Sequence, residues 1–252
     1  MIITDEEIIC LKEFKYKDND KILRVLSRNK GNIQLIAKGA RKAKSKLLNI
    51  SQVLCYSKCD LTNNRDMYIL SNGELIKNFY NIRTNLDSFF MSSYVLELVD
   101  YISRQNELIS NLFEMTLKFY TVIDELSKYD DVTKDINILV AMFEIKLASM
   151  LGYRPVLRNC IYCGVSIKSN AYIDTENGGL VCNECLKKYR NKNLFLLNNE
   201  SIVMMEKLIM TKFQNYSELG NVDKVLLNYI RQYLHYHIGK NNFKSLDMFK
   251  KI

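Results

Sequence analysis

The chain has 252 residues, of which 48% are hydrophobic and 25% are charged, proportions typical of a globular protein rather than a disordered or fibrous one. No apolar run approaches the ~20 residues of a membrane span, and the N-terminus lacks the basic and apolar segments of a signal peptide. We therefore expect a cytoplasmic protein without a membrane partner, whose seven cysteines are kept reduced.

The net charge of +8 is unevenly distributed along the chain. Residues 1–80 have a balance of +6, residues 81–155 of −4 and residues 156–252 of +6. No acidic residue lies between Asp20 and Asp60, although ten basic residues do. Clustered positive charge repels itself and is tolerated when a polyanion is the partner. A solvated basic face is the plainer alternative.

The first 80 residues are predicted to form a small β-barrel. Short apolar or alternating runs indicate five strands, at residues 8–11, 21–26, 32–37, 52–61 and 67–70. Five short strands in about seventy residues are typical of an OB-fold, although an SH3-like barrel would give the same pattern.

A polar segment, residues 38–46, follows the third predicted strand and contains five cations and no acid. On a barrel it would be a loop suited to binding phosphates and poorly suited to reading bases. Tyr16, Tyr56 and Tyr68 could stack on unpaired bases, with core packing as the alternative; Tyr16 is the best candidate because its loop is polar. The cations that we expect to contact phosphates are Arg24, Arg28, Lys38, Arg41, Lys42, Lys44 and Lys46.

From about residue 82 onward, apolar residues recur every three or four positions, which predicts helices. Gly152 with Pro155, and Gly239, are the expected stop signals of the third and last helices. The predicted helices cover approximately residues 82–102, 109–123, 136–151, 199–213 and 222–238. The fold class is therefore α+β, with an N-terminal barrel followed by a helical domain.

Two C-x2-C pairs interrupt the helical part, Cys160 with Cys163 and Cys182 with Cys185. Their spacing is that of a zinc ribbon, in which a tight turn brings both sulfurs of each pair to one metal. The residues between the pairs read as a hairpin that turns at residues 177–179 and returns the second pair to the first. Four thiolates fill a tetrahedral site, which indicates one structural Zn²⁺; spacing alone also permits iron.

The remaining cysteines and the two histidines are not expected to bind metal. Cys55 and Cys59 would lie roughly 13 Å apart on one strand, so we expect both, and Cys10, to be core residues. His235 and His237 would face apart on a helix. No nucleotide-binding or metalloprotease motif occurs, and we expect no enzymatic activity.

Several short strings together resemble the RecO family of DNA repair proteins over nearly the whole chain. They include residues 20–23, 38–42, 93–100, 143–147 and 151–155, followed by the first cysteine pair with Gly164, and then residues 236–239 and 244–246. One departure is the loop at residues 16–20, where many relatives have a Gly-Glu-Ser-type turn.

The resemblance implies an OB-fold DNA-binding domain at residues 1–80 and a helical domain at 81–155 and 193–252, with a zinc-ribbon insertion at 156–192. It also implies a recombination mediator that acts at the nucleoid. Such a protein binds single- and double-stranded DNA, anneals complementary strands, and works with RecR to help RecA replace the single-strand-binding protein SSB. Many relatives also contact the acidic C-terminal tail of SSB.

The location of a tail-binding site is open. An apolar slot beside cations is required, and Tyr229, Arg231, Tyr233 and Lys240 could supply one, although the same stripe could be core. Two other functional classes remain: a zinc-ribbon nucleic-acid-binding protein of transcription or translation, and a metal-dependent nuclease. The lack of acidic residues between positions 21 and 59 counts against a nuclease site in the basic domain.

Overall fold

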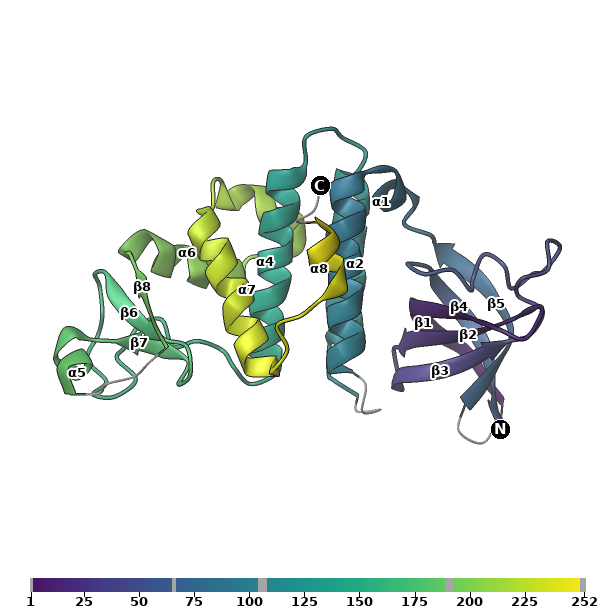
Figure 1. Cartoon of the computed structure of the whole chain (residues 1–252), viewed down its shortest axis with the longest axis horizontal. Helices are drawn as coiled ribbons and strands as arrows, with labels where there is room; N and C mark the ends of the chain where they lie inside the picture. Colours follow the sequence, from purple (N-terminus) through teal and green to yellow (C-terminus); the bar gives the residue numbers. More distant parts are fainter. Residues whose placement is uncertain (1, 65–66, 104–107, 189–192, 250–252) are drawn as a thin grey trace. The chain divides into compact units, whose positions relative to one another are not determined.

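The computed structural model describes residues 2–64, 67–103, 108–188 and 193–249 (Figure 1). For residues 248 and 249 it describes the backbone alone. The chain forms two compact units. The first comprises Met1–Val132 with Phe243–Ile252, and the second comprises Thr133–Asn242. No helix among the described residues is long and apolar enough to cross a membrane.

The first unit begins with a closed five-stranded barrel, which confirms the predicted class. Its strands are β1 (Ile2–Tyr16), β2 (Asp20–Ser27), β3 (Gly31–Ala37), β4 (Tyr56–Asn64) and β5 (Met67–Lys77), in the order β1-β2-β3-β5-β4. All neighbours are antiparallel except β3 and β5. β1 pairs with both β2 and β4, and two register shifts bend it so that it can close the barrel. Alternate apolar side chains, such as Leu23, Leu35 and Leu61, fill the interior.

The predicted fourth strand began too early. Residues 52–55 form a turn, and β4 begins at Tyr56. Leu54 has a positive φ of 65°, which no regular strand accommodates, and its backbone N–H donates to Cys10 O at 3.0 Å. This hydrogen bond therefore holds the end of the β3–β4 connection against β1.

The helices of the first unit are α1 (Tyr80–Thr84), α2 (Leu86–Ile102), α3 (Leu112–Leu126) and the C-terminal α8 (Lys244–Phe249). Asn85 caps α2, because its side chain accepts a hydrogen bond from Ser88 N. The chain returns to this unit through Phe243, whose ring packs edge-on against Tyr94, and through Ser245, which donates to Glu97. The sequence pattern had not predicted α8.

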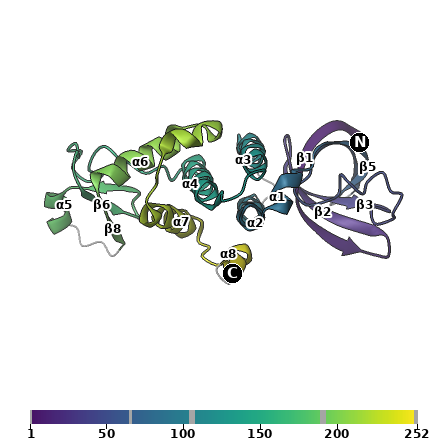
Figure 2. The same cartoon turned by 90° about the horizontal axis from the view of Figure 1, so that it is seen from above.

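The second unit combines a helical cluster with a small sheet. α4 (Thr133–Met150) packs against α6 (Asn199–Met210), α7 (Lys224–Ile238) and the 3₁₀ segment η1 (Phe213–Leu219) (Figure 2). The sheet has the order β7-β6-β8, formed by β6 (Ala171–Asp174), β7 (Gly179–Val181) and β8 (Leu194–Leu197). The β6–β7 hairpin confirms the prediction, whereas β8 and α5 (Asn183–Lys188) had not been predicted. Gly239 ends α7 with a φ of 67°, as expected for a C-cap.

Candidate metal centre and nucleic-acid interface

The four cysteines of the two C-x2-C pairs lie together in the second unit. The Sγ atoms of Cys160, Cys163, Cys182 and Cys185 all lie within 4.8 Å of one another, and those of Cys163 and Cys182 are 3.6 Å apart. Tetrahedral coordination at the usual Zn–S length of ~2.3 Å places sulfurs ~3.8 Å apart. The cluster therefore has the size and donor set of a four-thiolate metal site.

Local electrostatics favour ligation at this cluster. Burial opposes ionisation of Cys160, but the backbone N–H groups of Cys182, Cys163 and Tyr162 overcome it and lower the pKa of Cys160 to about 6. Burial, followed by hydrogen bonding to the other three thiols, raises the pKa of Cys185 to about 12. Thiols packed this closely cannot all ionise without a cation among them, and a divalent metal would supply that charge.

Two tight turns position the cysteine pairs. Gly164, with a φ of 75°, closes the first turn by donating its N–H to Cys160 O at 2.9 Å. Asp174 holds the hairpin turn, because its carboxylate accepts hydrogen bonds from the backbone of Glu176 and Asn177 and from Tyr162 Oη. Asp174 is fully buried. The sequence analysis did not identify it; an aspartate two residues before the Glu-Asn-Gly-Gly turn was the available signal.

The other cysteines are core residues, as predicted. Cys10, Cys55 and Cys59 are at most 1% exposed, and burial raises the pKa of Cys59 to about 12. Burial also raises the pKa of Cys55 and that of Cys10. None of the three belongs to a metal-competent cluster within the described parts of the chain. These thiols are therefore poor ligands and poor nucleophiles.

The two histidines of α7 serve in packing. His235 is buried, and the ring of His237 stacks on Tyr153 with a centroid distance of 4.4 Å and meets Tyr233 edge-on. Burial lowers the pKa of His237. Neither histidine joins a metal-competent cluster among the residues that the structure describes.

The structure divides the seven predicted phosphate-binding cations into two groups. Arg24 and Arg28 lie on or beside β2 and form ion pairs, Arg24 with Asp100 and Arg28 with Glu7 and Glu114. The other five lie in the β3–β4 connection and are exposed. Arg41 is partly engaged, because its guanidinium donates to Asp18 O at 2.8 Å. The remaining four have no carboxylate in ion-pair range among the described residues: Lys38, Lys42, Lys44 and Lys46.

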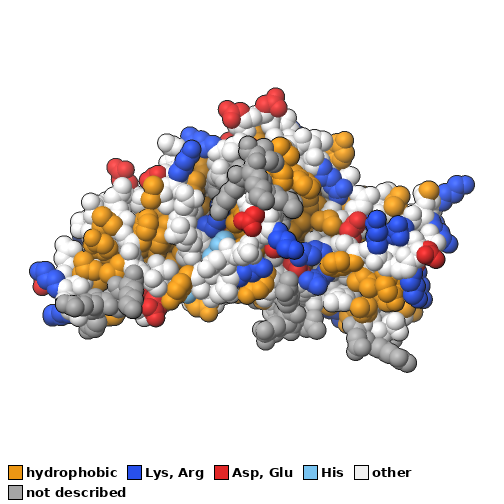
Figure 3. Space-filling view, viewed as in Figure 1, with side chains coloured by type: hydrophobic (Ala, Val, Ile, Leu, Met, Phe, Trp, Pro, Cys, Tyr) orange, Lys and Arg blue, Asp and Glu red, His pale blue; other side chains and the backbone are white. Residues whose placement is uncertain are grey.

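The connection is folded onto the β1–β2 turn. Gly39 N donates to Asp20 Oδ1 at 2.8 Å, and Arg41 N donates to Asn19 O at 3.0 Å. Lys17, Lys38 and Lys42 line a shallow hollow between the two segments, together with Asp18 and Asp20. Figure 3 shows basic side chains gathered over this end of the barrel. The arrangement presents several cations on one side of the barrel, in a geometry able to bind a phosphate backbone.

The three tyrosines considered for base stacking differ in exposure. Tyr16 is 37% exposed, and Lys17 Nζ lies 5.4 Å from its ring centroid. Tyr56 donates to Glu7 and meets Phe113 edge-on, so it is engaged in packing. Tyr68 is half-buried beneath Lys30. Tyr16 therefore remains the most accessible of the three.

The apolar slot suggested for α7 is not present there. Tyr229 and Tyr233 are buried, Tyr229 stacks on Phe195, and Arg231 pairs with the buried Glu144 at 2.8 Å. This stripe is core, which was the alternative interpretation.

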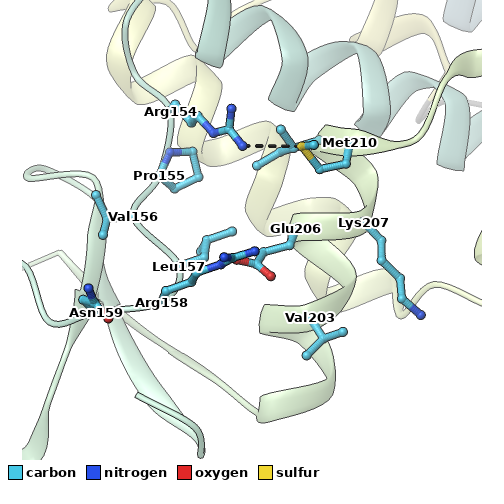
Figure 4. A pocket seen from close by; sticks show the side chains of 11 residues that line it. Arg154, Pro155, Val156, Leu157, Arg158, Asn159, Val203, Glu206, Lys207 and Met210 are labelled. Carbon is cyan, nitrogen blue, oxygen red and sulfur yellow. Dashed lines mark hydrogen bonds and ion pairs between the residues drawn. The ribbon is translucent and has the colours of Figure 1, made fainter. Parts of the chain in front are cut away.

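An apolar hollow beside cations lies instead between residues 154–159 and α6 (Figure 4). Val203 and Met210 are exposed within it, and Arg154 and Lys207 stand at its edge. Arg158 pairs with Glu206 across it at 2.8 Å. We refer to the hollow lined by residues 154–159 and 203–210 as the α6 groove. It combines apolar surface with a net positive charge.

Comparison with known proteins matches the chain to one family along nearly its whole length. The model for the N-terminal domain of recombination protein O matches residues 1–79, and the model for its C-terminal domain matches residues 83–247. A DNA repair protein RecO from Acetivibrio thermocellus is 30% identical over 250 residues, covering 96% of each chain. Proteins of the same name from Clostridium perfringens and Alkaliphilus metalliredigens are 30% and 29% identical over essentially the full length of both chains.

Proposed function

The chain belongs to the RecO family of DNA repair and recombination proteins, and we propose that it is a recombination mediator that works without enzymatic chemistry. It would bind single- and double-stranded DNA, anneal complementary strands and, with RecR, help load RecA onto DNA coated with SSB. Full-length similarity to proteins named DNA repair protein RecO is the observation that carries this proposal. A role in transcription or translation, the alternative for a zinc-ribbon protein, has no comparable support.

The β3–β4 connection is the proposed contact with DNA. Lys38, Lys42, Lys44 and Lys46 are exposed, and no acidic residue occurs in their stretch of sequence. Annealing requires that repulsion between two phosphate backbones be lowered while the bases stay free to pair. Lysine side chains achieve this by displacing counterions, which needs no catalytic group. The charges of Arg24 and Arg28 are offset by carboxylates, so their contribution is expected to be smaller.

The four-cysteine cluster is proposed to hold one structural Zn²⁺. Cys160, Cys163, Cys182 and Cys185 would saturate a tetrahedral ion, which leaves no position for water or substrate. The metal would join the first knuckle, at residues 160–164, to the end of the β6–β7 hairpin. A ribbon this small has little core of its own, so ligation would supply most of its stability.

The α6 groove is the proposed site for the acidic C-terminal tail of SSB. Arg154 and Lys207 would attract its carboxylates, and the exposed Val203 and Met210 would cover an apolar side chain. Apolar pockets with a few cations at the edge suit short acidic peptides that end in an apolar residue.

Fluorescence-detected annealing tests the proposed function. Two complementary oligonucleotides, each coated with SSB, are mixed with and without the protein and without ATP. A mediator accelerates annealing, and the acceleration decreases as salt rises because the contacts are electrostatic. Unchanged annealing across the salt range, or cleavage of the DNA when magnesium is added, would contradict the proposal.

A further inference from the structure

An apolar row crosses the outer surface of the barrel. Phe14 on β1 pairs with Ile22 on β2, Ile22 with Ile36 on β3, and Ile36 with Ile69 on β5. Residues in direct register share one face of a sheet, so the four side chains lie next to one another. Leu23, Leu35 and Leu70 are adjacent to three of them along the strands and point into the barrel, where each is at most 2% exposed. The row therefore lies outside the core.

The row is accessible to solvent. Phe14 is 46% exposed, with the Arg24 guanidinium 5.9 Å from its ring centroid, and the three isoleucines are only partly buried. Figure 3 shows a hydrophobic patch over this part of the barrel. Tyr16, two residues beyond Phe14 and on the same face, extends the aromatic surface and is 37% exposed. A contiguous, partly exposed apolar row of this kind is a candidate contact surface for a partner.

Cations border the row on both of its sides, along the direction of the strands. On one side, Lys12 pairs in register with Arg24, and both contact the single carboxylate of Asp100, which leaves a net positive charge. On the other side, the hollow beside the β1–β2 turn is lined by Lys17, Lys38 and Lys42 and also by Asp18 and Asp20, so the three cations exceed the two acids by one charge. Apolar surface between two positive borders matches a polymer that has apolar faces on a negative backbone.

We propose that this row is a platform for the unpaired bases of single-stranded DNA, with Phe14 as the residue on which a base stacks. The inference rests on the proposed function and deepens it by naming the strand state that the barrel recognises. In a duplex the base faces are already stacked, so Phe14 would have no access to them. The lysines bind either form of DNA, and the row adds affinity for the unpaired form alone.

A single introduced tryptophan tests the proposal directly, because the chain has none. Phe14→Trp places the reporter in the row. Tyr129→Trp is the matched control, because Tyr129 is 68% exposed and precedes Asp130 and Asp131, which repel DNA. Each variant is titrated with oligo-dT, with an abasic strand of equal length and with a duplex. Binding is followed in parallel by the anisotropy of labelled DNA.

We expect oligo-dT to quench the tryptophan fluorescence of the Phe14→Trp protein strongly, the abasic strand and the duplex to quench it little, and the control to respond to none. Phe14→Ala should weaken binding of oligo-dT by about ten-fold, within the range of one lost stacked base, and should leave binding of the abasic strand unchanged.

If the anisotropy shows that oligo-dT binds while the tryptophan fluorescence of the Phe14→Trp protein is not quenched, the stacking proposal is overturned and the proposed function stays intact. Absence of any DNA binding would remove both, and quenching that depends on protein concentration without DNA would assign the row to a second copy of the chain.

Discussion

The carboxylate of Asp100 on α2 is fully buried and lies 2.8 Å from the Arg24 guanidinium on β2. The ammonium group of Lys12 reaches the same carboxylate at 3.0 Å, and Asn32 Nδ2 lies 3.4 Å from it. One acid therefore joins three barrel strands, β1, β2 and β3, to the first long helix. This network explains why a cluster of basic residues in the sequence does not become a uniformly basic surface.

Replacing Asp100 by asparagine should destabilise the protein by about 2–3 kcal/mol, because two cations lose their partner at a buried position. Urea unfolding at neutral pH measures this, with Asp130→Asn on an exposed residue as the control. Burial would raise the pKa of Asp100, but Arg24 and Lys12 lower it below its usual 3.8. The stabilisation is therefore complete above that value and is lost as the pH falls below it. Equal stability of the two variants at neutral pH would show that the network contributes nothing.

Lys146 should make stability rise with pH on the alkaline side. Burial, together with the nearby Arg154, lowers the pKa of Lys146 to about 8, and its ammonium group donates to Ile209 O. Between about pH 8 and 10.5 the unfolded chain binds more protons at this residue than the folded chain, so the free energy of unfolding increases with pH. The comparison is with Lys146→Met, which lacks the titration. A wild-type curve parallel to that of the variant from about pH 7 to 10 would contradict the assignment.

Metal content should depend on the two C-x2-C pairs and on no other cysteine. Cys182→Ser should reduce bound zinc from about one ion per chain to nearly none and make the ribbon sensitive to protease. Cys55→Ala, at a buried cysteine of the barrel, should retain the ion. A colorimetric zinc assay after denaturation measures both. Full zinc in the Cys182→Ser protein would place the metal elsewhere, and iron in the native protein would contradict the proposed metal.

An acid introduced into the α6 groove, the proposed site of the SSB tail, should weaken binding of that tail. Val203→Glu places an acid where an apolar side chain would bind and should lower affinity for a fluorescent tail peptide at least ten-fold. Val225→Glu is matched in chemistry and lies on an exposed part of α7, so it should bind normally. If both variants bind the peptide as the wild type does, the tail binds elsewhere.

Local spacing predicted the metal cluster and the barrel class. The two cysteine pairs could be recognised because a two-residue gap restricts how the sulfurs can point, whatever the rest of the chain does. An apolar-rich run similarly identified β2, and alternation of apolar residues identified β3.

Long-range contacts were not predictable in this way. Asp100 lies 76 residues from Arg24, and no local pattern indicates that they meet. β8 was missed for the same reason, because it pairs with β6, which precedes it in the sequence by about twenty residues that include the second cysteine pair. The burial of Tyr229 and Tyr233 likewise depends on which other elements pack over α7. Helical periodicity shows that one face is apolar, but not whether that face is covered.

The affinity of lysine variants for single-stranded DNA tests the central claim most directly. Lys42, Lys44 and Lys46 are changed together to alanine, with Lys118, Lys134 and Lys224, which are exposed on other elements, changed together as a control of equal net charge. Binding of oligo-dT is measured across a salt series. The account predicts that the first triple variant binds more weakly and that its log–log salt dependence is shallower by about 2, while the control matches the wild type. Wild-type affinity and salt dependence in the first variant would show that the β3–β4 connection is not the DNA contact.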